Sequence, residues 1–423
     1  MRRFAVLAGA LALTVVGAAG AAELPTAKPE SVGLSSERLA RITDVFAADT
    51  KSGRLSGAVL AIVRDGKLAY FKAIGERDPA SHAPMRGDEV FRLYSMSKPF
   101  TSVAAMILVE RGQLYLGDPV AKYIPAFKEM QVGVVKTDAA TGKSELATEP
   151  ARRQITIQDL MRHTSGLVYG VLFKSTPVKE LYKKAGIYER DQTLAEMVDK
   201  LAHLPLAHQP GEVFDYSHST DVLGRVVEVV SGMPLDQFVA KNITGPLGLR
   251  DTGYFVPKAA WGRIAEPAVD PKTGKPPPLR DLREPQKLLS GGGGMVGTAR
   301  DYLRFMQMLL NGGTFDGARV LSAADVHFMT SDHLGSIPHD TDSGSYLLGS
   351  GYGFGLGFAV RLADGLNTMP GTKGDFYWGG AGGTQFWIDP ERKLLALMMI
   401  QQQNEFDHYW RLYRDLVYQA VVR

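Results

Sequence analysis

The sequence predicts an α/β fold combined with an all-α part, in which an antiparallel sheet flanked by helices receives an inserted helical domain. Apolar and β-branched runs with turn sequences between them occur near both ends of the chain, at 56–71 and 384–400. The segments between them are mostly periodic in the manner of helices. We therefore expect one sheet built from both ends, with residues 24–94 and 290–423 in the α/β domain and 95–289 in a mainly helical domain.

Composition narrows the function classes. The 423 residues are 45% hydrophobic and 22% charged, with a formal net charge of +3, which is an ordinary globular balance. No basic run or stripe indicates a nucleic-acid partner. The absence of cysteine excludes thiolate catalysis, disulfides and cysteine zinc sites. The nine histidines show no ligand spacing and no His-Glu-x-x-His motif, so we expect no metal.

The N-terminus predicts an export signal over residues 1–21. Arg2 and Arg3 form a positive region, an apolar run follows from Phe4 to Val16, and Ala19-Gly20-Ala21 offers a small-residue cleavage site. A membrane anchor is the alternative, but the apolar run is short for a spanning helix. No later segment resembles a transmembrane helix. We expect a periplasmic or secreted protein without a stable membrane anchor.

The first elements along the chain are a helix and a hairpin. Residues 36–48 place Leu39, Ile42 and Phe46 towards one side of a helix. The runs 56–63 and 67–71 flank Asp65-Gly66, and an Asp-Gly pair between two β-rich runs predicts a hairpin. A helix is expected from Ser95 to Arg111. It begins no earlier than about Ser95, because Pro99 is tolerated only near a helix start.

The middle of the chain predicts further helices and two loops. Helical periodicity occurs in four segments, which are 157–163, 194–203, 221–230 and 235–243. Residues 132–153 are polar and residues 256–287 are rich in proline, so both are expected to be loops. These loops either border the active site or form ordinary surface.

The last third predicts strands again. A glycine run at 291–294 precedes a helix at 299–310, and residues 352–360 form a glycine-rich strand candidate. The segments 384–388 and 394–400 bracket a turn and predict a second hairpin, whose second strand is apolar enough to be buried on both faces. An amphipathic helix at 405–422 closes the chain.

Ser95-Met96-Ser97-Lys98 is a candidate nucleophile and base. Residues three apart share one face of a helix, which suits a serine whose proton passes to a neighbouring amine. A capped, solvated helix start is the alternative. The chain contains no Gly-x-Ser-x-Gly elbow.

Two further segments could complete such a site. Residues 209–221 place Tyr216 at a strand-to-helix junction, where a phenol could relay a proton if nearby cations lower its pKa from about 10. A half-buried tyrosine with a hydrogen-bonded tip is the alternative. Residues 376–385 contain glycines that permit close approach of a ligand, or that form a bulge or bend.

Together and in this order, the three segments resemble the serine β-lactamase and penicillin-binding-protein superfamily. Within it, the chain is most similar to family VIII carboxylesterases and to the class C β-lactamases. The resemblance spans nearly the whole mature chain and includes Arg162-His163-Thr164-Ser165-Gly166-Leu167 and the glycine run followed by Asp301-Tyr302-Leu303-Arg304-Phe305. It implies a β-lactamase-like fold.

The resemblance also implies roles for individual residues. Ser95 matches the family nucleophile, Lys98 its helix partner, and Tyr216 the tyrosine of the Tyr-x-Asn motif. Lys98 and Tyr216 would act together as general base and then acid. The backbone N–H groups of Ser95 and Ala381 would form the oxyanion hole.

Two departures from the family pattern bear on the substrate. His218 stands where the motif has Asn, either as a substrate-binding residue or as a surface histidine without a catalytic part. Trp378-Gly379-Gly380 replaces Lys-Thr-Gly and so removes a cation and a hydroxyl that would hold a substrate carboxylate. A tryptophan there favours an apolar acyl or alcohol group. Both departures favour esters over β-lactams.

We therefore expect an exported carboxylesterase that cleaves short-chain, small-molecule esters through an acyl-enzyme on Ser95, without a metal or organic cofactor. A class C-like β-lactamase or D-amino-acid peptidase is the first alternative. Acyl transfer to a specific acceptor is the second. A non-catalytic cell-wall-binding protein is the third, and the presence of Ser95, Lys98 and Tyr216 together argues against it.

Overall fold

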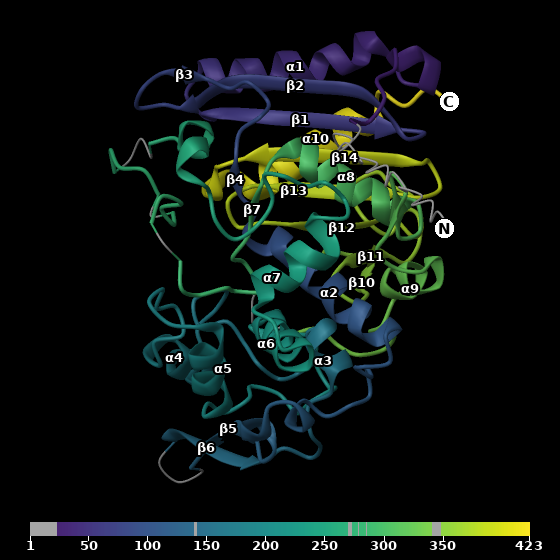
Figure 1. Cartoon of the computed structure of the whole chain (residues 1–423). Coiled ribbons are helices and arrows are strands. Elements are labelled where there is room, and N and C mark those ends of the chain that lie inside the picture. Colours follow the sequence, from purple (N-terminus) through teal and green to yellow (C-terminus); the bar gives the residue numbers. More distant parts are fainter. Residues whose placement is uncertain (1–22, 139–141, 270–272, 278, 285, 341–347) are drawn as a thin grey trace, which may run out of the picture.

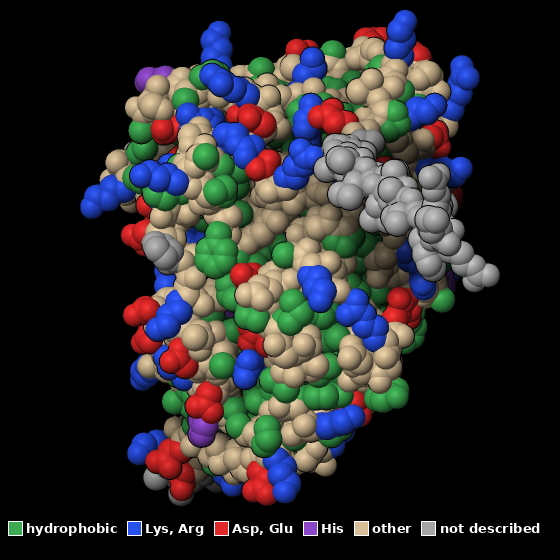
Figure 2. Space-filling model, viewed as in Figure 1, with side chains coloured by type: hydrophobic (Ala, Val, Ile, Leu, Met, Phe, Trp, Pro, Cys, Tyr) green, Lys and Arg blue, Asp and Glu red, His purple; other side chains and the backbone are tan. Residues whose placement is uncertain are grey.

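A computed structural model describes residues 23–138, 142–269, 273–277, 279–284, 286–340 and 348–423 (Figure 1). The predicted export signal at 1–21 lies outside these residues. Among the described residues, no helix combines the length and apolar character needed to cross a membrane. Lys, Arg, Asp and Glu side chains are interspersed over the face shown in Figure 2.

An eight-stranded antiparallel sheet organises the fold, as predicted, and joins the two ends of the chain. Its strand order is β10-β11-β12-β13-β14-β1-β2-β3. The strands are β1 (Gly57–Arg64), β2 (Lys67–Asp78), β3 (Ala83–Pro84), β10 (Tyr352–Phe354), β11 (Ala359–Arg361), β12 (Phe376–Gly379), β13 (Gln385–Asp389) and β14 (Leu394–Ile400). Ala61 of β1 pairs with Leu397 of β14, so the junction between the two ends lies inside the sheet. The domain boundaries stay a prediction.

Both predicted hairpins are confirmed. Asp65 and Gly66 connect β1 to β2 with φ values of 50° and 71°, the left-handed conformations that a two-residue type I′ turn requires. β14 pairs with β13 on one side and β1 on the other, and every residue of β14 is buried. Its continuous apolar sequence follows from this central position.

Helices cover both faces of the sheet. Trp387 packs against Tyr413 of α10 (Phe406–Tyr418), whereas its neighbour Phe386 packs against Tyr302 of α8 (Ala299–Leu310). Consecutive strand residues point to opposite faces, so α8 and α10 lie on opposite sides of the sheet. The N-terminal helix α1 (Ser36–Lys51) packs beside α10 and along β2 (Figure 1).

The helical part is centred on α2 and α6, which pack against each other. α6 also contacts α3, α5 and α7, and all the predicted helices in this part are present. Their bounds are α2 (Lys98–Glu110), α3 (Ile157–Met161), α5 (Leu194–Ala202), α6 (Ser219–Ser231) and α7 (Leu235–Val239). The helix predicted to reach residue 243 continues from α7 as a π turn, Ala240–Thr244. Two short helices, α4 (Pro177–Lys184) and α9 (Ala323–Met329), were not predicted.

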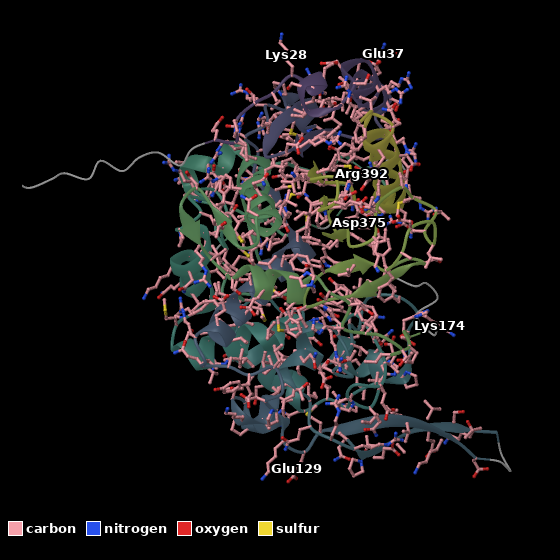
Figure 3. All side chains as sticks on the ribbon, turned by 90° about the vertical axis from the view of Figure 1, so that its right-hand side faces the viewer. Lys28, Glu37, Glu129, Lys174, Asp375 and Arg392 are labelled. Atoms are coloured by element: carbon pink, nitrogen blue, oxygen red, sulfur yellow. The ribbon has the colours of Figure 1, made fainter. Side chains whose placement is uncertain are left out.

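Two loop and strand predictions are wrong. The polar segment 132–153 contains a hairpin of β5 (Gln131–Thr137) and β6 (Ser144–Pro150), which projects from the body of the protein (Figure 3). Most of its residues are exposed or half-buried, so the strands lack the apolar alternation by which a half-buried strand is recognised. The strand predicted at 352–360 is instead two antiparallel strands, β10 and β11, with Gly355 and Gly357 in the turn between them.

Two small ladders complete the described structure. β4 (Phe91–Arg92) pairs with β7 (Val296–Gly297), and β8 (Thr314–Phe315) pairs with β9 (Ala318–Arg319). The described parts of 256–287 hold no strand and one short 3-10 helix, Lys258–Arg263, in keeping with the predicted loop. The β4–β7 pair matters for function, because it brings the segment before Ser95 beside the glycine run.

Candidate active site

Ser95 lies in a tight turn between a strand and a helix. The chain leaves β4, passes through a 3-10 turn at Tyr94–Ser97 and enters α2 at Lys98, with Pro99 in the first helical turn. The regular helix therefore begins three residues later than the expected Ser95, within the limit that Pro99 sets. Tyr94 has a φ of 45°, a left-handed conformation that costs a non-glycine residue on the order of 1 kcal/mol. This turn orients the Ser95 side chain towards Lys98.

The Lys98 amine directly contacts the candidate nucleophile. Its Nζ lies 3.2 Å from Ser95 Oγ, 3.1 Å from the hydroxyl of Tyr169 and 2.7 Å from the carbonyl oxygen of Gly292. All three hydrogen-bonding positions of the amine are thus occupied. The i, i+3 spacing predicted this contact between Ser95 and Lys98, and the structure shows it.

The surroundings of Lys98 make it a base. The side chain is 1% exposed, and this burial lowers the pKa of its amine to about 7, while the Asp221 carboxylate opposes part of that shift. A large fraction of Lys98 is therefore neutral near pH 7. A neutral amine 3.2 Å from a hydroxyl can accept its proton.

Tyr216 also packs against Lys98. The Lys98 Nζ lies 4.6 Å from the centre of its ring. Burial raises the pKa of Tyr216 above its usual value, so the condition that nearby cations lower it is not met. Its buried hydroxyl makes no hydrogen bond of ordinary geometry within the described chain, although the side chains of Ser95 and Trp378 lie close enough to oppose that rise. Tyr216 is therefore a protonated phenol at neutral pH, suited to donate rather than to begin as a base.

The segment after β12 lies against the nucleophile turn. A Cβ on Gly380 would collide with the Leu93 carbonyl oxygen and the Thr384 hydroxyl, so only glycine permits this approach. Ala381 follows immediately in a turn. Over the part of the chain that the structure describes, neither the Ser95 nor the Ala381 N–H donates to a backbone acceptor. Both N–H groups are thus available for the predicted oxyanion hole.

Trp378 forms part of an aromatic wall. Its ring centre lies 5.2 Å from that of Tyr216 and 5.2 Å from that of Phe354, and the side chain is buried. His163 also packs on Tyr216, with ring centres 4.8 Å apart, and burial holds the pKa of His163 well below its usual value. The wall is aromatic and carries no charge at neutral pH, in contrast to the lysine that the Lys-Thr-Gly motif has in this place.

His218 is an internal residue, so the interpretation as a surface histidine is wrong. It is 3% exposed and directly precedes α6. Its Nδ1 lies 3.0 Å from Asp221 Oδ2, its Nε2 lies 3.4 Å from the Tyr188 hydroxyl, and its ring packs 4.2 Å from that of Tyr169. All three contacts join His218 to other side chains of the protein. Binding of substrate by His218, Trp378, Gly379 or Gly380 stays a prediction.

The structure adds residues that the sequence did not single out. Tyr169 and the Gly292 carbonyl hold Lys98, and Asp221 holds the glycine run in turn by accepting hydrogen bonds from the Ser290 hydroxyl at 2.5 Å and the Gly292 N–H at 3.0 Å. Asp221 and Gly292 lie in segments with predicted features, whereas Tyr169 and Ser290 do not, and none of the four carries a spacing to Ser95 that identifies it.

Part of the 256–287 loop also packs at this site. Arg280 donates a hydrogen bond to the Gly294 carbonyl at 2.8 Å, and its own carbonyl accepts one from Arg92 at 2.5 Å. Arg280 lines a cavity of about 180 Å³ together with Tyr254 and Leu282. At Arg280, therefore, the loop contacts the glycine run rather than forming ordinary surface.

One group of potential metal ligands lies outside the site. His208, Asp215 and Asp340 place their ligand atoms within 4.8 Å of one another. The Lys179 ammonium lies 4.0 Å from Asp215 and 3.7 Å from Asp340. This lysine already supplies a positive charge there and would repel a metal ion. The site at Ser95 involves none of these residues.

Comparisons with known proteins cover nearly the whole described chain. The family model described as Beta-lactamase matches residues 42–419. Protein Rv1367c of Mycobacterium tuberculosis is 38% identical over 365 residues, which cover 83% of this chain and 86% of the relative. Esterase EstB of Burkholderia gladioli is 32% identical over 404 residues, covering 89% and 94%. The solved structure of EstCE1, a hydrolase with promiscuous acyltransferase activity, matches with 30% identity and a TM-score of 0.73, covering 90% and 99%.

Proposed function

Because this chain belongs to the beta-lactamase family, we propose that it is a serine carboxylesterase that cleaves short-chain esters through an acyl-enzyme on Ser95. The observation that carries the proposal is the contact of Ser95 Oγ with a buried Lys98 amine, 3.2 Å away, whose pKa is lowered to about 7. Similarity to esterase EstB and to the hydrolase EstCE1 supports the choice of esters.

Acylation follows from the protonation states of the three side chains. Neutral Lys98 takes the proton of Ser95 as Oγ attacks the ester carbonyl carbon. The N–H groups of Ser95 and Ala381 stabilise the oxyanion. As the tetrahedral intermediate collapses, the C–O bond to the alcohol breaks and Tyr216 gives its proton to the departing oxygen. This step leaves an acyl-serine, a Lys98 ammonium and a Tyr216 phenolate, a charged pair that lies above the neutral pair in free energy because burial lowers the pKa of Lys98 and raises that of Tyr216, and that deacylation discharges.

Deacylation reverses these roles. The Tyr216 phenolate takes a proton from water, which attacks the acyl carbon, and Lys98 returns its proton to Ser95 Oγ as that bond breaks. The cycle ends with the starting protonation states and releases one carboxylic acid and one alcohol. No step requires direct proton transfer between Lys98 and Tyr216.

The Trp378-Gly379-Gly380 segment supports esters over β-lactams. It removes the cation and hydroxyl that the Lys-Thr-Gly segment offers to a substrate carboxylate, and it places a buried aromatic ring beside Tyr216. An alcohol also leaves a tetrahedral intermediate more readily than an amine does.

The apolar character of residues 4–16 supports a further part of the proposal, export to the periplasm or beyond without a stable anchor.

A substrate panel tests the assignment. We expect p-nitrophenyl acetate and butyrate to be turned over faster, per enzyme, than esters of long acyl chains and faster than nitrocefin. Initial rates for the graded series and nitrocefin should be measured side by side, with the Ser95→Ala protein as the blank. Nitrocefin hydrolysis well above ester hydrolysis would instead assign a β-lactamase.

The pH dependence tests the role of Lys98. Only the neutral amine can accept the proton of Ser95, so kcat/KM should rise with pH and reach half its plateau near pH 7, where the pKa of Lys98 lies at about 7. Steady-state rates between pH 5 and 9 provide the measurement, after subtraction of spontaneous hydrolysis. A midpoint near the ordinary lysine value of about 10 would contradict this role.

A further inference from the structure

The Gly292 carbonyl makes the shortest of the three contacts to the Lys98 amine, at 2.7 Å. The direction of the amine towards Ser95 therefore depends on where residues 291–294 lie. This run forms no helix or strand, so its position depends on individual hydrogen bonds, which include that from the Gly294 N–H to the Ser290 carbonyl at 2.9 Å. Thr101 supplies one of them by donating a hydrogen bond to the Gly291 carbonyl at 2.8 Å.

Asp221 supplies two more contacts, in addition to the hydrogen bond from Arg280 to the Gly294 carbonyl. Its Oδ1 accepts hydrogen bonds from the Gly292 N–H at 3.0 Å and from the Ser290 hydroxyl at 2.5 Å. A Cβ on Gly292 would lie only 2.9 Å from Asp221 Oδ2, so glycine is needed for the carboxylate to come this close. Gly292, whose carbonyl binds Lys98, is thus held through its own N–H by a carboxylate that is 2% exposed.

His218 holds the second oxygen of the same carboxylate. Its Nδ1 lies 3.0 Å from Asp221 Oδ2. The Tyr188 hydroxyl accepts a hydrogen bond from the Gly170 N–H at 2.9 Å and can donate its own proton to His218 Nε2, 3.4 Å away. That arrangement leaves the Nδ1 proton for Asp221. The other face of the imidazole packs on Tyr169, which is itself a partner of Lys98.

We propose that His218 and Asp221 form a positioning pair that holds the Lys98 amine against Ser95 and supplies a negative charge that favours its ammonium form. Asp221 acts through Gly292, whose N–H it binds and whose carbonyl binds Lys98, and His218 acts through Asp221 and Tyr169. The inference rests on the proposed esterase function. His218, which stands where the family motif has Asn, then positions the general base and does not contact substrate.

The protonation of Lys98 depends on the titratable groups around it and around Asp221. The groups within contact or electrostatic reach of Lys98 or of Asp221 are His163, Tyr169, Tyr188, Tyr216, His218, Asp221 and Tyr254. Burial raises the pKa of the tyrosines of this group, among them Tyr169 and Tyr216, and lowers that of His163. These side chains are therefore uncharged at neutral pH. Asp221 is the carboxylate of the group. Burial opposes its ionisation, but the interactions with His218, Ser290 and Lys98 together outweigh burial and lower the pKa of Asp221.

Asp221→Asn removes the negative charge at position 221 and keeps the size of the side chain. An amide of the same size no longer favours the ammonium form of Lys98, so the acidic limb of the kcat/KM profile should move to lower pH. Misplacement of the amine should also lower kcat about 10- to 100-fold. Ser290→Ala is the matched control, because it removes a hydrogen bond to the same oxygen and leaves the charge. Its acidic limb should coincide with that of the wild type.

A second pair of variants tests His218 without changing Asp221. Asparagine can still donate a hydrogen bond to Asp221, whereas leucine cannot. We expect His218→Leu to lower kcat at least about 10-fold with little change in KM, because the base is misplaced while the pocket remains. His218→Asn should recover most of that loss. Thermal melting of each variant establishes that the protein compared is folded.

Two results would overturn the inference. One is an Asp221→Asn profile whose acidic limb coincides with that of the wild type, and the other is equal turnover by the two His218 variants. If Asp221→Asn fails to fold, the His218 pair decides alone. Failure of the proposed function is distinct, because wild-type protein would then show no turnover that Ser95→Ala abolishes.

Discussion

Ser95→Ala is expected to lower turnover of p-nitrophenyl butyrate by at least about 10³-fold, which is the effect of removing a nucleophile that acts as a unit with its base. The change deletes the one oxygen that Lys98 contacts at 3.2 Å and that can bond to the acyl carbon. Because the backbone is unchanged, the Ser95 and Ala381 N–H groups remain, so a small residual rate is compatible with the mechanism.

The measurement requires two readouts. Steady-state hydrolysis should be compared with that of Ser52→Ala, a matched control in an exposed position at the end of α1. Mass spectrometry after treatment with a fluorophosphonate should show one added group on the peptide containing Ser95, in the wild type and in Ser52→Ala alone. Full turnover by the Ser95→Ala protein would remove Ser95 from the mechanism.

Tyr216→Phe is expected to lower turnover at least about 10²-fold, the lower range for lost acid–base catalysis. Phenylalanine keeps the ring that packs against Trp378 and Lys98 and deletes the proton donor for the leaving alcohol. The loss should therefore be larger for alkyl esters than for p-nitrophenyl esters, because p-nitrophenolate leaves without much help from an acid.

Tyr182→Phe provides the matched control for this change. Tyr182 of α4 is also fully buried with a hydroxyl that makes no hydrogen bond among the described residues. Its removal should leave turnover near that of the wild type, since Tyr182 contacts neither Ser95 nor Lys98. Equal losses for alkyl and p-nitrophenyl esters in Tyr216→Phe would contradict the assignment of Tyr216 as the acid.

Local sequence predicted those parts of the molecule that local forces determine. A few adjacent residues determine the structure of the Asp65-Gly66 turn and of the apolar strand β14. The contact between Ser95 and Lys98 was predictable for the same reason, since i, i+3 spacing fixes it. The β5–β6 hairpin was missed because both of its faces are largely polar, so no period of two marks it.

The electrostatics of the site could not be predicted in this way. The sequence leaves open whether cations lower the pKa of Tyr216, and in the folded chain burial raises it. Burial likewise makes His218 an internal residue. Asp221, Ser290 and Gly292 meet through hydrogen bonds that join distant segments, and only the folded chain defines these contacts. The roles of the site residues remain predictions that the variants above test.

The pairing of β1 with β14 has a consequence for how the protein is made. β1 can pair with β2 as soon as the hairpin at Asp65-Gly66 has been synthesised, but its other edge waits for the last strand of the chain. During that interval an apolar strand edge is open, and such edges pair readily with other chains. The nascent protein is therefore most prone to aggregation before residues 394–400 arrive. Loss of a short C-terminal piece that includes β14 would destroy the enzyme, even though Ser95, Lys98, Tyr216 and Ala381 would all be present.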